Sequence, residues 1–220
     1  MKSNLIIGFP GLSYKSEKGR LEKIAGHFPD YDFKKVEYSG ITKKQNTITI
    51  PFSIETFSKD IEIPKNYDQV GVIASSTGVA VFNHYLSTHR NTSIKWYIAI
   101  SPFCKLSPIA RAQIKQLNQT NLDLILPRNQ EQDIKRIIPN EYLQNLLSLD
   151  ANLETSLPRI PYVLTLIGSQ DTIIDIEEAK KHHPQKMGLQ TQIRIYNTPH
   201  FLNNQSTKDA ITFIKKITTP

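Results

Sequence analysis

Residues 70–78 read VGVIASSTG, an apolar run that changes abruptly into a turn rich in small and hydroxyl side chains. The run from Val70 to Ala74 has no polar alternation, which is typical of a parallel strand covered on both faces. The apolar residues that follow Gly78 have helical spacing through Leu86. The stretch therefore predicts a buried strand that turns sharply into a helix, with Ser75 and Ser76 at the turn.

Strands and helices alternate on both sides of this stretch. Further strands are predicted at 5–9, 33–38, 96–100, 162–168 and 192–196, and helices at 17–28, about 175–182 and about 207–217. Residues 41–52 are ambiguous, and residues 54–61 favour a short helix. Parallel strands separated by helices form a sheet that is wound on both faces.

Residues 103–158 interrupt this alternation. Apolar residues at 109–117 and 134–149 have helical spacing, and no strong strand separates the two segments. We therefore expect a helical insertion at 103–158, with residues 1–102 and 159–220 forming the core.

Composition narrows the function classes. The 220 residues are 39% hydrophobic and 21% charged, which favours a soluble globular chain with a substantial core. The formal charge of +7 is scattered, without a basic run interleaved with aromatic residues, which argues against nucleic-acid binding.

The single cysteine, Cys104, allows no internal disulfide framework and favours a reducing compartment. The apolar run near the N-terminus is too short for a signal peptide or a membrane span, so we expect a cytoplasmic protein without stable membrane insertion.

The two serines differ in what surrounds them. A sharp turn from strand to helix that presents a nucleophile brings the residues two before and two after it close together, so small side chains are needed there. Those residues are Ala74 and Gly78 for Ser76, but Ile73 and Thr77 for Ser75. Only Ser76 satisfies the turn. The alternative is that these hydroxyl residues simply cap the helix.

A serine nucleophile needs a base and a group that orients the base. Asp171 follows the strand predicted at 162–168, and His200 follows the strand predicted at 192–196. In an open parallel sheet the carboxyl ends of the strands form the ligand-binding edge. Ser76, Asp171 and His200 are therefore predicted to meet there, in the chain order serine, acid, histidine.

These motifs together resemble the α/β-hydrolase superfamily over nearly the whole chain. Residues 74–78 resemble its G-x-S-x-G elbow, residues 168–171 its glycine-then-acid loop, and residues 198–201 its histidine loop. The resemblance implies a mostly parallel, doubly wound sheet of the α/β-hydrolase type with a helical cap insertion. It also implies a catalytic triad of Ser76, Asp171 and His200.

The N-terminal segment IGFPG, residues 7–11, resembles the H-G-F-P-G segment of the same superfamily. By that match the backbone amide of Phe9 joins the amide of Thr77 in the oxyanion hole. Ala74 stands where the elbow pattern has glycine, and Ile7 where the H-G pair has histidine. The family's first two antiparallel strands have no counterpart before Ile7, so we expect a sheet trimmed at the N-terminus.

Other residues compete for these roles. Asp175 is an alternative acid, although it stands where a helix cap is expected. His84 and His89 come too early in the chain for the base, and His182 and His183 fall at a predicted helix end. No cysteine or acid cluster accompanies the histidine pair, and no nucleotide-binding glycine pattern occurs, so we expect neither a metal nor a cofactor. Cys104 is expected to be a buried structural thiol.

The resemblance and the residues together predict a serine hydrolase that forms an acyl-enzyme on Ser76. The expected substrate is a carboxylic ester or thioester, either a small molecule or an acyl group on a carrier. Two alternatives stay open: an acyltransferase with the same nucleophile, and a non-catalytic binding protein of the same fold. The sequence leaves the oligomeric state undetermined.

Overall fold

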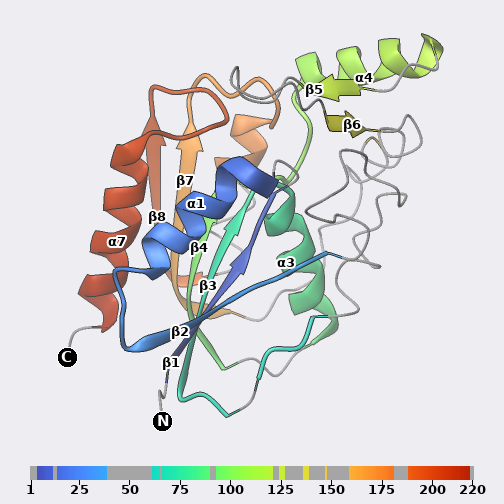
Figure 1. Cartoon of the computed structure of the whole chain (residues 1–220). Helices are drawn as coiled ribbons and strands as arrows, with labels where there is room; N and C mark the ends of the chain where they lie inside the picture. The colour runs from blue at the N-terminus through green and yellow to red at the C-terminus, as the bar shows by residue number, and fades with distance from the viewer. Residues whose placement is uncertain are drawn as a thin grey trace.

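A six-stranded sheet in the order β2-β1-β3-β4-β7-β8 forms the centre of the molecule (Figure 1). The computed structural model describes residues 4–11, 14–38, 61–64, 66–89, 93–120, 124–126, 136–138, 147, 159–180 and 188–218. The strands of the sheet are β1 (Asn4–Phe9), β2 (Tyr31–Lys35), β3 (Gln69–Ser75), β4 (Ile94–Ile100), β7 (Ile160–Gly168) and β8 (Gly188–Tyr196). Every pairing between them is parallel, so their carboxyl ends lie along one edge.

Helices cover both faces of this sheet (Figure 1). On one face lie α1 (Tyr14–Ala25) and α7 (Asn204–Thr218), and on the other lies α3 (Thr77–Thr88). A further helix, α4 (Pro108–Thr120), lies beyond the edge toward which the strands point. Alternate residues of each strand enter different apolar clusters: Ile6 and Ile73 pack with α1 and α7, whereas Ile7 and Val72 pack with α3. The central strands are therefore apolar on both faces, as the run at 70–74 predicts.

Gly71 explains the only interruption in that run. A Cβ on Gly71 would lie 1.9 Å from the Trp96 ring, on the adjacent strand β4. Trp96 is buried and packs across the position that a side chain of residue 71 would occupy. The glycine thus makes room for the largest aromatic side chain in the sheet.

The strands predicted from the sequence are confirmed, with shifted bounds. The strand predicted at 33–38 is β2 and ends at Lys35, while the strand predicted at 192–196 is β8 and begins at Gly188. Residues 176–180 form the beginning of the helix predicted near 175–182. The ambiguous segment 41–52 and the helix predicted at 54–61 lie outside the described residues, except for Ile61, which is buried and not helical.

The segment between β4 and β7 differs in part from the prediction. Its first helix is α4, as expected, but residues 136–138 of the helix predicted at 134–149 form a strand. This strand, β6 (Arg136–Ile138), pairs antiparallel with β5 (Leu124–Leu126), with Ile137 opposite Ile125. The prediction of an uninterrupted helix is therefore wrong at 136–138, where β-branched residues take part in a ladder. Figure 1 shows α4, β5 and β6 beyond the edge toward which the strands of the main sheet point.

Within the described part of the chain, no helix is long and apolar enough to cross a membrane.

Candidate active site

Ser76 lies in the sharp turn between β3 and α3 that the sequence predicts. Its backbone has φ 49° and ψ −119°, an unfavourable region for a residue with a side chain. A Cβ on Gly78 would lie 2.3 Å from the Phe9 carbonyl oxygen and 2.7 Å from that of Pro10. The glycine is therefore required because the first turn of α3 lies directly against the backbone that follows β1.

The side chain of Ser76 does not cap the helix that it precedes. Ser76 occupies the N-cap position of α3, yet its hydroxyl makes no capping hydrogen bond. Ser76 Oγ instead lies 3.0 Å from His200 Nε2, and both residues are buried. The geometry therefore favours a hydrogen bond of the Ser76 hydroxyl with His200 over the alternative that this hydroxyl caps α3. Ser75 stays in the strand as its last residue.

Asp171 contacts the other nitrogen of the same imidazole. Asp171 Oδ2 lies 2.7 Å from His200 Nδ1. Asp171 Oδ1 accepts hydrogen bonds from the backbone amides of Ile173 and Ile174, at 2.8 and 3.1 Å. Because a carboxylate only accepts, this network assigns the proton of a neutral His200 to Nδ1. Nε2 is then left as the acceptor for the Ser76 hydroxyl.

The loops after β7 and β8 are held against each other by their backbones. A Cβ on Gly168 would lie 2.4 Å from the Pro199 carbonyl oxygen and 2.5 Å from that of Thr198. The amide of Gln170 donates to the Thr198 carbonyl at 3.0 Å. This close approach brings the acid and the histidine within reach of each other, and it depends on the absence of a side chain at residue 168.

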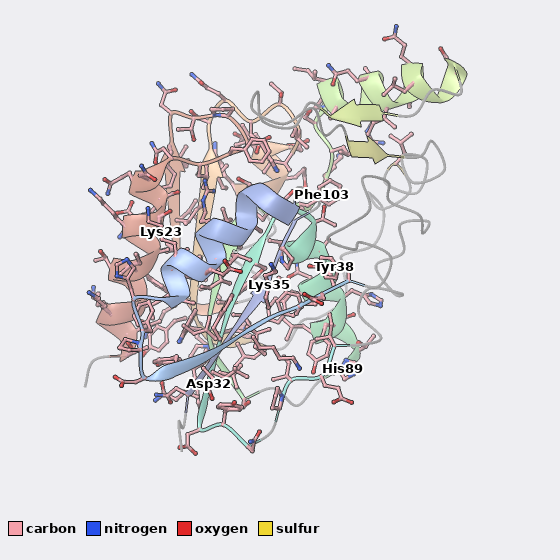
Figure 2. All side chains as sticks on the ribbon, viewed as in Figure 1. Lys23, Asp32, Lys35, Tyr38, His89 and Phe103 are labelled. Atoms are coloured by element: carbon pink, nitrogen blue, oxygen red, sulfur yellow. The ribbon has the colours of Figure 1, made fainter. Side chains whose placement is uncertain are left out.

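The structure gives the competing residues other contacts. Asp175 Oδ1 accepts from the amide of Glu178 at 3.1 Å, which is the capping contact expected at the start of a helix. His89 lies at the end of α3 remote from Ser76 (Figure 2), and His84 lies one turn from that same end. His182 and His183 lie outside the described residues. Cys104 is partly exposed rather than fully buried as expected. Desolvation of its thiol, followed by the nearby charge of Glu178, raises the pKa of the thiol to about 12, which favours a structural role over a reactive one.

The two predicted oxyanion residues lie near each other. Thr77 is the first residue of α3, and Phe9 is the last residue of β1, in register with Ala74 of β3. The Phe9 carbonyl faces Gly78, so the end of β1 borders the start of α3. Ile7, in place of the family's histidine, is buried in the apolar cluster beneath α3. That the amides of Phe9 and Thr77 bind an oxyanion stays a prediction.

Sequence reasoning missed a contribution from the end of β4. Ser101 follows this strand directly, and its hydroxyl donates to the His200 backbone carbonyl at 2.7 Å. The sequence places Ser101 just past a predicted strand, and thus at this edge of the sheet, but nothing near it in the sequence indicates the contact with His200. Phe103 lies at the same edge of the sheet (Figure 2), and its amide approaches the Ser76 carbonyl at 3.4 Å.

Among the described residues, no group of three or more histidine, cysteine or acidic side chains could hold a metal ion.

Comparison with known proteins identifies the architecture. No protein-family model matches the chain, and no curated protein matches it. Among solved structures, one of the metagenome-derived lipolytic enzymes LipS and LipT superimposes with a TM-score of 0.73 at 12% identity, covering 98% of this chain and 94% of that one. The monoacylglycerol lipase of Paleococcus ferrophilus gives a TM-score of 0.68 at 17% identity, with 96% and 94% coverage.

A soluble variant of the monoglyceride lipase of Saccharomyces cerevisiae gives a TM-score of 0.66 at 12% identity, covering 99% of this chain and 89% of that one. These TM-scores, at nearly complete coverage, establish a shared fold, and identities of 12–17% establish the fold alone. The parallel sheet, the turn at Ser76 and these superpositions agree with the resemblance of the sequence motifs: the chain has the α/β-hydrolase fold.

Proposed function

We propose that this protein is a serine hydrolase that cleaves a carboxylic ester or thioester through an acyl-enzyme on Ser76. One observation carries the proposal: a continuous line of hydrogen-bonding atoms from the Ser76 hydroxyl through both nitrogens of His200 to Asp171. A serine hydroxyl is a weak nucleophile at neutral pH unless a base takes its proton. His200 lies at the distance that such a base requires.

The first half of the reaction acylates the serine. Ser76 Oγ attacks the carbonyl carbon of the substrate while His200 Nε2 takes the hydroxyl proton. As the tetrahedral intermediate collapses, the same imidazole returns this proton to the leaving alcohol or thiol. The acyl group then remains on Ser76 as an ester.

Asp171 serves the imidazole in two ways. Its Oδ2 accepts a hydrogen bond from Nδ1–H of His200, which orients the ring and stabilises the imidazolium that forms during the attack. Its Oδ1 accepts hydrogen bonds from the amides of Ile173 and Ile174, which fix the position of the carboxyl group. The acid therefore stays aligned with the imidazole while the proton moves between Ser76 and His200.

The oxyanion of the intermediate needs donors on the other side of Ser76. The Thr77 amide stands at the N-terminus of α3, where unpaired amides and the helix dipole favour negative charge. The Phe9 amide comes from the strand end that borders this helix. Together the two amides are our assignment for the oxyanion hole.

In deacylation His200 Nε2 takes a proton from water as the water oxygen attacks the acyl carbon. The bond from that carbon to Ser76 Oγ then breaks, the imidazole returns the proton to Ser76, and the carboxylic acid is released. The segment 103–158 is our candidate for a cap over the acyl group, because its described elements lie at the edge of the sheet where Ser76 stands (Figure 1). Phe201 is 52% exposed, and its ring meets the His200 ring edge-on at a centroid distance of 5.5 Å. An apolar surface beside the base favours a substrate with an apolar acyl or alcohol group.

The structural neighbours are consistent with this chemistry. They include lipolytic enzymes, two monoglyceride lipases and an esterase from Exiguobacterium antarcticum, names that refer to the hydrolysis of esters. The likeness supports hydrolysis of an ester in general. The assignment to Ser76 comes from the geometry of this chain.

Covalent labelling tests the proposal. The protein would be treated with a fluorophosphonate, and the modified residue would be identified by mass spectrometry. Ser76→Ala and His200→Ala would be run in parallel, with Ser75→Ala as the matched control for a neighbouring serine. We expect one label, on Ser76, that persists in Ser75→Ala and is lost in both other variants.

The same preparations would be tested for hydrolysis of p-nitrophenyl butyrate and of a butyryl thioester. Labelling without turnover of either compound would argue for acyl transfer to an acceptor other than water. If the wild-type protein remains unlabelled while a known serine esterase reacts under the same conditions, the hydrolase assignment is wrong and a binding role becomes the better account.

A further inference from the structure

Ser101 lies at the end of a strand whose backbone is hydrogen-bonded to the strands on either side, which lead to Ser76 and Asp171. It directly follows β4, which lies between β3 and β7 in the sheet. The Ser76 amide donates to the Ile100 carbonyl at 2.9 Å, and the Ser101 amide donates to the Leu166 carbonyl at 2.8 Å. The backbone at 100–101 is therefore bonded on one side to the nucleophile turn and on the other side to the strand that leads to the acid.

The side chain of Ser101 reaches the third reacting residue. Its hydroxyl lies 2.7 Å from the His200 carbonyl oxygen, and because a carbonyl only accepts, the serine must donate. Ser101 is 2% exposed and His200 8% exposed. Water is thus largely excluded from this hydrogen bond, and removal of the hydroxyl would leave the carbonyl without its donor.

The backbone of Ser101 is unusual as well. Among the described non-glycine residues, only Ser76 and Ser101 have a positive φ, and that of Ser101 is 45°. Such a conformation is unfavourable for a residue with a Cβ and persists where the surroundings hold it in place. A glycine would adopt it more easily, so the serine here is not explained by the turn.

We propose that Ser101 is a positioning residue that fixes the backbone of His200 so that its imidazole stays aligned between Ser76 and Asp171. This inference rests on the proposed function of the site. Ser101 acts through His200 and contacts neither the substrate nor the reacting atoms. A displacement of about 1 Å in such a group can reduce the rate by roughly a hundredfold. Loss of the hydroxyl is therefore expected to lower kcat roughly ten- to a hundredfold and to leave KM unchanged.

Two substitutions separate the hydroxyl from the backbone conformation. Ser101→Ala removes the hydroxyl and keeps the Cβ, whereas Ser101→Gly removes the hydroxyl and relieves the unfavourable φ. If the hydroxyl matters, both variants are slow. If only the turn matters, Ser101→Gly equals the wild type.

Ser206→Ala is the matched control. Ser206 is 1% exposed, and its hydroxyl donates to a backbone carbonyl, that of Asn203, at 2.6 Å. Its side chain is thus as buried as that of Ser101 and also donates to a backbone carbonyl, but the acceptor residue, Asn203, is exposed and is not a reacting residue. A general effect of removing a buried hydroxyl would appear equally in this variant.

The experiment measures the rate constant and the final extent of fluorophosphonate labelling at Ser76, together with kcat and KM for p-nitrophenyl butyrate. Misalignment slows labelling but lets it reach completion, whereas partial unfolding lowers the final extent. We expect slow, complete labelling and a lowered kcat in Ser101→Ala and Ser101→Gly, with wild-type values in Ser206→Ala.

Wild-type rates in both Ser101 variants would overturn the positioning role and leave the hydrolase intact. An incomplete final extent at an unchanged rate constant would also overturn it, in favour of a purely structural role. Absence of labelling in the wild-type protein would remove the proposed function, and the positioning role with it.

Discussion

The turn at Ser76 and the loop at Asp171 are built alike in one respect and differently in another. Each contains a glycine, Gly78 or Gly168, at which a Cβ would collide with the backbone of a neighbouring loop. The Ser76 side chain makes no capping hydrogen bond within its own turn. By contrast, Asp171 Oδ1 accepts hydrogen bonds from two backbone amides of its own loop. The nucleophile is therefore positioned by the backbone around it, while the acid helps to build the loop that positions it.

The largest expected effect would come from filling the space at either glycine. Gly78→Ala and Gly168→Ala each place a Cβ within 2.5 Å of a backbone oxygen, which no side-chain rotation can relieve. We expect each to lower the free energy of unfolding by about 3 kcal/mol and to abolish most activity. Urea unfolding with an ester assay would measure both.

Gly19→Ala is the control for these substitutions, since among the described residues no atom outside its chain neighbours and the backbone of α1 lies within 4 Å of a Cβ at that position. It should raise the stability by about 0.5–1 kcal/mol, as alanine favours a helix over glycine. Wild-type stability in Gly78→Ala or Gly168→Ala would contradict the shared construction of the two turns.

A smaller effect on stability would distinguish the loop at Asp171 from the turn at Ser76. Asp171→Ala leaves the amides of Ile173 and Ile174 without their acceptor, so we expect it to cost about 2 kcal/mol more stability than Ser76→Ala. Asp171→Asn retains an oxygen for these amides and should recover most of the stability, but not the activity. Thermal unfolding of the three variants would decide, and equal stability of Asp171→Ala and Ser76→Ala would show that the loop does not depend on the carboxylate.

The smallest effect is expected for a substitution of Asp175, the alternative to Asp171 as the acid of the site. Asp175→Ala removes a helix cap and should lower the stability by about 1 kcal/mol, with the ester hydrolysis rate changed by no more than a few fold. Its rate would be compared directly with that of Asp171→Asn. A larger loss of rate in Asp175→Ala than in Asp171→Asn would reverse the assignment of the acid.

Much of the fold and of the candidate site follows from local sequence. Buried parallel strands are nearly continuous apolar runs, so the ends of β3 and β7 could be located, and with them Ser76 and Asp171. The end of β8, an exposed strand at the edge of the sheet, follows from the alternating apolar residues in QIRIY at 192–196, which locates His200. The choice between the two serines needed only the size of their neighbours. These features depend on residues close together in the chain, where spacing and side-chain volume carry the information.

Features that depend on distant pairing could not be predicted in this way. Residues 134, 137 and 138 have the spacing of a helix, yet β6 forms because Ile137 pairs with Ile125 of β5. The contact of Ser101 with His200 joins two loops that are distant in sequence, and no local pattern specifies it. Local periodicity leaves such choices open because the partner strand or loop supplies the deciding energy.

The hydrogen bond between Ser76 and His200 spans 124 positions of the chain, and β4, β7 and β8 all lie between them in sequence. Because these strands must form and pair before the two side chains can meet, a nascent or partly folded chain would have no activated serine. Under the proposed mechanism, reactivity toward a fluorophosphonate would therefore count completely folded molecules. A single label could then measure the yield of folding in a crude cell extract, without purification and without knowledge of the natural substrate.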